Sequence, residues 1–182
     1  MKELSLHILD LVQNSIRAEA TLVEICITES IEKNLLEIEI NDNGKGMPHE
    51  ILDKASDPFF TSRTTRDVGL GIPLFKQMAE HCNGNISLIS EEGIGTRLIS
   101  TFEINHIDRQ PLGDIEGVLV LLLVANPSVR FVYTHQTISG KYVFDTLEIK
   151  NILGNSTIND SGIIKFIKEM IRENLVDINA NC

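Results

Sequence analysis

The sequence has few cysteines, and those it has do not form a recognisable site. Cys26, Cys82 and Cys182 are scattered along the 182 residues and cannot all pair within one chain. Their spacing is neither that of a metal site nor that of a redox pair. We therefore expect a reducing compartment, the cytoplasm.

Basic residues are also in short supply. The chain has 16 Lys and Arg against 26 Asp and Glu, which gives a formal net charge of −10. Residues 1–110 hold 10 basic and 18 acidic side chains, and residues 111–182 hold 6 and 8. Such a surface repels phosphate backbones, so we do not expect nucleic acid as a partner.

Long apolar runs are missing as well. The uncharged run at 118–125 has eight residues, too few to cross a bilayer. The chain enters a helical pattern at its first residues, without the features of a signal peptide. We expect a cytoplasmic protein without a membrane partner, and a length that suits one domain or one domain plus a small second one.

Residues 3–19 have the periodicity of an amphipathic helix. Its apolar face is formed by Leu4, Ile8, Leu11, Val12 and Ile16. A polar stripe at spacings of three, four and three is formed by His7, Asp10, Asn14 and Arg17. A solvated helix face is the simple interpretation, but asparagine is a poor surface helix former, and this favours a functional stripe.

A second candidate site follows the alternating residues 36–40, which predict a strand ending at Asp42. The chain then turns through Gly44 and Gly46, which tolerate unusual backbone angles and leave room for a ligand. A carboxylate beside bare backbone suits a flat group with an exocyclic amine. An ordinary turn is the alternative, because Asp-x-Gly-x-Gly often occurs by chance.

Residues 57–71 show no period, and their hydroxyls, arginines and closing glycines favour a mobile flap that faces phosphate, with an exposed loop as the alternative. A helix is predicted over 72–82. It begins directly after Gly69-Leu70-Gly71, and a helix N-terminus favours an anion. Strands at 86–90 and 96–104 flank a turn at 91–95.

These elements, taken in order, resemble a known family. The polar helix, the Asp42 turn, the glycine turn before the helix at 72–82 and Gly93-Ile94-Gly95-Thr96 are similar to the ATP-binding domain shared by gyrase, histidine kinases, a heat-shock chaperone and mismatch-repair ATPases. Residues 57–63 resemble the phenylalanine box of histidine kinases. The resemblance covers about residues 3–105, and is nearest to histidine kinase and anti-sigma-factor kinase domains. It implies a two-layer α/β sandwich, a mixed sheet with helices on one face.

The resemblance also implies ATP and Mg²⁺ as ligands and a role for each matching residue. Asp10 would orient the attacking water or hydroxyl, Asn14 would hold Mg²⁺, and Asp42 would read the adenine. The other nucleotide-binding residues would be Arg17, Gly44, Gly46, Arg63, Gly69, Leu70, Gly71 and Thr96. The chain departs from the family at Asp67, usually a glycine, and at Asp10, which is a glutamate in many relatives. His7 either touches the site or has a capping or surface role.

We expect residues 1–107 to form the ATP-binding domain and residues 112–182 a small α/β module. The module's predicted elements are a helix at 114–123, strands at 130–135 and 141–145, and helices at 147–153 and 160–174. It contains no catalytic constellation. A partner-binding or self-association element, with a possible homodimer, and a structural annex remain equal alternatives.

The expected function is that of a regulatory protein that binds ATP and Mg²⁺, and either hydrolyses ATP slowly or transfers phosphate to a protein partner. The alternative is a non-catalytic adaptor for which ATP is a conformational ligand. A structural module with an inactive pocket is disfavoured by Asn14, Asp42 and the glycines. Since no phosphoacceptor domain precedes the helix at 3–19, we do not expect a complete sensor histidine kinase.

Overall fold

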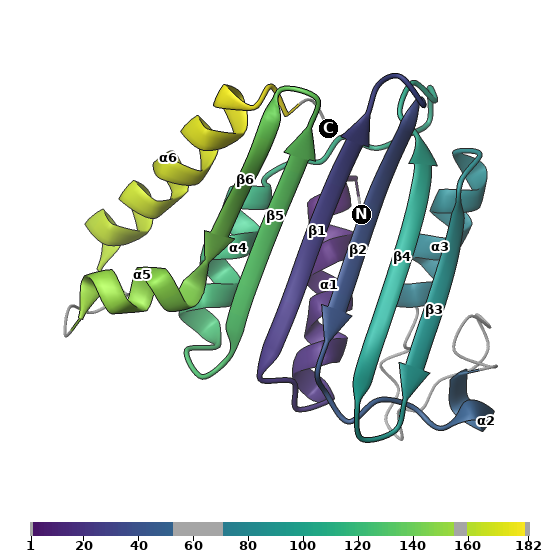
Figure 1. Cartoon of the computed structure of the whole chain (residues 1–182), viewed down its shortest axis with the longest axis horizontal. Coiled ribbons are helices and arrows are strands. Elements are labelled where there is room, and N and C mark those ends of the chain that lie inside the picture. The colour runs from purple at the N-terminus through teal and green to yellow at the C-terminus, as the bar shows by residue number, and fades with distance from the viewer. Residues whose placement is uncertain (1, 53–70, 155–159, 181–182) are drawn as a thin grey trace.

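The computed structural model describes residues 2–52, 71–154 and 160–180, and these form a sheet with helices packed against it (Figure 1). The six strands are β1 (Leu22–Ser30), β2 (Leu35–Asp42), β3 (Asn85–Glu91), β4 (Gly95–Glu103), β5 (Arg130–Thr137) and β6 (Gly140–Asp145). The helices are α1 (Leu4–Arg17), α2 (His49–Leu52), α3 (Gly71–His81), α4 (Ile115–Ala125), α5 (Thr146–Leu153) and α6 (Ser161–Asp177).

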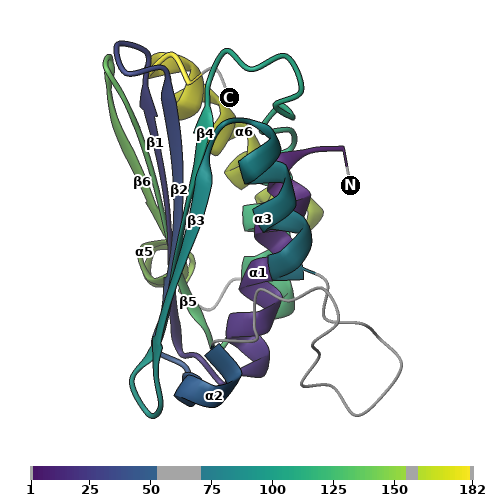
Figure 2. The ribbon, with the colours of Figure 1, turned by 90° about the vertical axis from the view of Figure 1, so that its right-hand side faces the viewer.

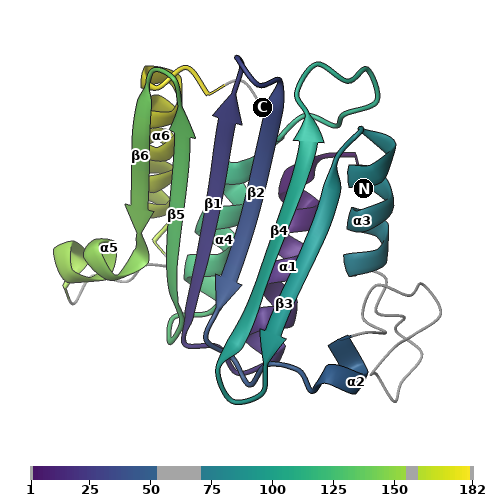
Figure 3. The ribbon, with the colours of Figure 1, turned by 45° about the vertical axis from the view of Figure 1, so that its right-hand side comes forward.

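The strands lie in the order β3-β4-β2-β1-β5-β6. Neighbouring strands are antiparallel except β1 and β5, which are parallel with Leu22 opposite Arg130. Figure 2 shows α1 and α3 on one side of this sheet, and Figure 3 shows α4 behind the sheet together with them. The predicted fold class, a two-layer α/β sandwich with a mixed sheet, is confirmed.

The core lies between the sheet and these helices. Along β1 every second residue faces the helices, so Val23, Ile25 and Ile27 are buried while Glu24 on the other face is exposed. From the other side, α1 contributes Leu4, Ile8, Leu11 and Val12. The sheet therefore has one apolar face and one face that is largely polar.

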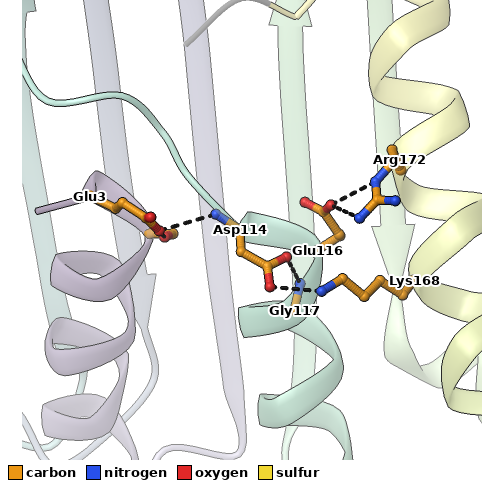
Figure 4. A network of polar contacts seen from close by, with 7 residues as sticks. Glu3, Asp114, Glu116, Gly117, Lys168 and Arg172 are labelled. Carbon is orange, nitrogen blue, oxygen red and sulfur yellow. Dashed lines mark hydrogen bonds and ion pairs between the residues drawn. The ribbon is translucent and has the colours of Figure 1, made fainter.

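The sheet is continuous across the predicted boundary at 107–112. Strand β5 pairs with β1 along its length, so the strands of the second part extend the sheet of the first. Helix α4 is buried between α1 and α6, and polar contacts join all three helices (Figure 4). Glu3 accepts from the backbone N–H of Asp114 at 3.3 Å, and Lys168 donates to Asp114 at 2.7 Å. The division into two units stays a prediction.

Several element ends differ from those predicted. Helix α1 ends at Arg17 rather than at residue 19, because Glu19 adopts a left-handed conformation with φ 62° and so leaves the helix. Helix α6 continues to Asp177, three residues beyond the predicted end. Among the described residues, no helix has the length and apolar character needed to span a membrane.

Candidate nucleotide-binding site

The site begins at the last two turns of α1. Asp10 and Asn14 are both partly buried and lie one turn apart, while Arg17 is exposed. The Arg17 guanidinium donates to the Asn14 side-chain oxygen at 3.2 Å. Because an amide oxygen has two lone pairs, this contact leaves Asn14 able to bind a hard cation.

Helix α3 begins beside these two residues. A side chain at Gly71 would place its Cβ 2.2 Å from an Asp10 carboxylate oxygen and 3.8 Å from the Asn14 amide nitrogen. Only glycine allows so close an approach without moving Asp10. The first turn of α3, with its free N–H groups, therefore faces the polar stripe of α1.

The turn that follows Asp42 is hydrogen-bonded to the end of α1 and to the residues after it. The Lys45 N–H donates to the Ala18 carbonyl at 2.8 Å, and the Asn43 side-chain oxygen accepts from the N–H groups of Thr21 and Leu22 at 2.9 Å each. Asn43 was not among the predicted site residues. It is an example of an Asx side chain that replaces missing backbone partners in a turn.

Asp42 itself is held through both carboxylate oxygens. Ser15 of α1 donates its hydroxyl to one oxygen at 2.6 Å, and the Gly44 N–H donates to the other at 2.9 Å. Sequence reasoning missed Ser15, although it directly follows Asn14. The only available signal was its place on the buried side of a helix that already carried functional residues.

The turn between β3 and β4 completes the surroundings of Asp42. Thr96 lies opposite Asp42 in the β2–β4 pairing, and its hydroxyl is 2.9 Å from that of Ser90. A Cβ at Gly95 would come within 1.9 Å of the Asp42 carbonyl oxygen. At Gly46, with φ 63°, a Cβ would come within 1.9 Å of the Glu91 carbonyl oxygen. Backbone segments therefore touch at both glycines, and neither position has room for a side chain.

His7 lies deeper than the rest of the stripe. It is 6% exposed, its ring centroid is 5.6 Å from that of Phe75, and its Nδ1 has no hydrogen-bond partner among the described residues. Burial lowers the pKa of this imidazole. The surface alternative for His7 is therefore wrong.

Some predicted residues lie outside the described part of the chain. They are Arg63, Gly69 and Leu70, together with Asp67 and residues 57–70 of the proposed flap. The structure brings together the remaining predicted residues, which come from α1, the end of β2, the start of α3 and the start of β4. Of these, Asn14 has the donor chemistry for Mg²⁺, as an oxygen ligand for an ion shared with phosphate and water.

Comparison with known proteins agrees with this arrangement. The chain is similar to the sensor histidine kinase ZraS of Escherichia coli K12, with 29% identity over 106 residues, 58% of this chain and 23% of that protein. It is 34% identical over 91 residues to the sensor protein kinase WalK of Staphylococcus haemolyticus, 47% of this chain and 15% of that protein. The chain thus spans less than a quarter of the length of these relatives.

A solved structure shows the same fold. The N-terminal domain of a DNA repair protein superposes with a TM-score of 0.60 and 18% identity, over 90% of this chain and 59% of that chain. This likeness of fold extends past residue 106. Residues 2–106 match the family described as histidine kinase-, DNA gyrase B- and HSP90-like ATPases. Because that match covers more than half of the chain, the protein belongs to this ATPase family.

Proposed function

We propose that this protein binds ATP with Mg²⁺ and hydrolyses it slowly or transfers its terminal phosphoryl group to a protein partner, in a regulatory role. The observation that carries the proposal is the meeting of Asp10 and Asn14 with Gly71 at the start of α3. A carboxylate, an amide oxygen and free helix N–H groups are what a triphosphate and its metal ion require. Membership of the ATPase family supports the same ligand.

Each residue has a defined task in this proposal. Asp42 accepts a hydrogen bond from the adenine amine, with Thr96 beside it. Asn14 holds Mg²⁺, which when bound neutralises phosphate charge. Asp10 orients a water molecule or a substrate hydroxyl, since positioning and electrostatics supply most of the catalysis of phosphoryl transfer. Arg17 adds positive charge near the phosphates.

Binding is tested first, through Asp42→Asn. The amide can present a donor where the adenine amine needs an acceptor, so we expect ATP affinity to fall by about 1.5–3 kcal/mol, the range for a hydrogen bond to a charged group. Titration calorimetry with ATP and Mg²⁺ measures this directly. Equal affinity in the variant and the wild type would show that the adenine site has been assigned incorrectly.

Turnover is tested with ATP radiolabelled at its terminal phosphate, incubated with the protein alone and with candidate protein partners. Release of phosphate indicates hydrolysis, and label on a protein band indicates kinase activity. The sensor kinase names of the relatives favour the second outcome for a chain of this family. Tight ATP binding with neither product would instead favour an adaptor that uses ATP as a conformational ligand.

A further inference from the structure

Ser15 is a buried hydroxyl whose position links two functions of the site. It is 4% exposed, directly follows Asn14 on α1, and donates to Asp42 at 2.6 Å across 27 residues of sequence. The same helical turn therefore carries Asn14, the proposed metal ligand, and a residue that contacts Asp42, the proposed adenine-binding residue. A serine in this position costs helix stability unless its hydroxyl is used.

The contact fixes how the Asp42 carboxylate is presented. One oxygen accepts from Ser15 and the other from the Gly44 N–H, so donors from two different elements prevent rotation of the group. The turn that holds Gly44 is tied to the end of α1, because the Lys45 N–H donates to the Ala18 carbonyl at 2.8 Å. Both contacts use Asp42 as an acceptor, which leaves only acceptor capacity for a ligand.

We propose that Ser15 is a positioning residue for nucleobase selection, which fixes Asp42 as an acceptor for an exocyclic amine. Adenine presents an amine at its six-position, whereas guanine and hypoxanthine present a carbonyl oxygen that Asp42 would repel. A group already held in its binding geometry loses less entropy when the ligand arrives. This inference rests on the proposed function, and adds to it the residue that makes the base contact selective.

The test removes the Ser15 hydroxyl from the protein and, separately, the six-amino group from the nucleotide. ATP and purine riboside triphosphate, which lacks only the six-amino group, are titrated with Mg²⁺ into wild type and Ser15→Ala by calorimetry. We expect Ser15→Ala to weaken ATP binding roughly three- to tenfold, the value of one hydrogen bond. Binding of purine riboside triphosphate should stay within about twofold of wild type, because it has no amine for Asp42 to accept from.

A matched control is Ser5→Ala. Ser5 is equally buried on the same helix, with its hydroxyl 3.4 Å from Glu3, away from Asp42. Neither nucleotide should change affinity in this variant. Should Ser15→Ala fail to fold, Ser15→Cys leaves no cavity and supplies a weaker donor, and should show a smaller loss in the same direction.

The outcomes separate the two proposals. Equal weakening of both nucleotides by Ser15→Ala, or no weakening of either, would overturn the role of Ser15 while leaving ATP binding intact. Failure of the wild type to bind either nucleotide would instead overturn the proposed function. Loss for ATP alone supports base selection, since a merely structural role would affect both ligands alike.

Discussion

Strand β1 has the candidate nucleotide site at its first residues and a buried polar network at its last. At the first end Val23 pairs with Asp42, and the chain there is a set of glycine turns in backbone contact. At the other end, buried Glu29 contacts His135 of β5 at 2.7 Å, and His135 contacts Tyr133 at 2.6 Å. At one end backbone segments touch at glycines, whereas at the other end polar side chains contact one another.

The difference shows which kind of residue each end of β1 requires. The site end depends on glycines, because a Cβ at Gly46 or Gly95 would clash with backbone atoms. The network end depends on side chains that must be present, because a buried polar group without its partner is costly. Substitutions should therefore affect function at one end and stability at the other, and the following experiments examine that contrast.

The largest effect is expected for Glu29→Ala. The change leaves His135 buried without this contact, and breaking such a buried pair costs about 3–5 kcal/mol of unfolding free energy. Urea denaturation measures it. The control is Glu39→Ala, which removes the contact of Glu39 with Arg97 at the largely polar face of the sheet, where a pair is worth at most about 1 kcal/mol. Similar losses in the two variants would contradict the structural importance of the network.

A pair of glycines in one turn tests the site end. Gly93 and Gly95 both have positive φ, at 80° and 144°, but a Cβ at Gly93 meets nothing within 4 Å. At Gly95 it would lie 1.9 Å from the Asp42 carbonyl. We expect Gly93→Ala to cost about 1–2 kcal/mol from its backbone conformation, and Gly95→Ala about 1–3 kcal/mol more from overpacking.

The same two variants should differ in ligand binding. Gly95→Ala displaces Asp42 and should weaken ATP binding measured by calorimetry, whereas Gly93→Ala should leave it unchanged. Equal ATP affinity in the two variants would show that the backbone contact between Gly95 and Asp42 does not contribute to ATP binding.

The next effect concerns turnover alone. Asp10→Asn keeps the size of the side chain but removes the carboxylate that orients the attacking group, so we expect turnover to fall on the order of 10²-fold, the lower range for a general base. ATP affinity should persist, since the proposed metal and adenine contacts lie on Asn14 and Asp42. Phosphate release under saturating ATP is the measurement, with Asn14→Ala as the comparison that weakens Mg²⁺-dependent binding. Unchanged turnover in Asp10→Asn would favour the adaptor alternative.

The sequence predicted the site end better than the network end. Asn14, Asp42 and Gly71 occur in the order of the family's motifs, so their grouping in space could be predicted. The contact of Ser15 could not be predicted, since it depends on how α1 sits against β2. For Glu29 a signal existed, because it continues the alternation of Val23, Ile25 and Ile27 and so faces the core.

The position of residues 112–182 in the fold could not be predicted from local sequence patterns. Their strands were predicted, but the parallel pairing of β5 with β1 is a contact between segments about a hundred residues apart. This pairing is what places His135 against Glu29. Long-range pairing is set by packing of whole faces, which residue propensities do not encode.

The smallest effect is expected at the beginning of α5, which lies at the same end of the sheet as the first residues of β1. Asp145 accepts from the Arg130 guanidinium and from the Leu147 N–H, and the Arg130 contact is the main reason that the pKa of this carboxyl lies below its ordinary value. A carboxyl with a lowered folded-state pKa adds stability above its unfolded pKa of about 3.9. That stability is lost as the pH falls through the folded value.

Asp145→Asn should therefore reduce the unfolding free energy at pH 7 by less than Glu29→Ala does, and the difference from wild type should shrink as the pH falls below about 4. Asparagine still caps α5, so helix formation is not the quantity that changes. Urea titrations at a series of pH values between neutral and acid measure the convergence. Arg130→Gln should reproduce the same pH dependence, because it removes the main cause of the shift. A difference that is constant with pH would assign the contribution of Asp145 to capping rather than to its charge.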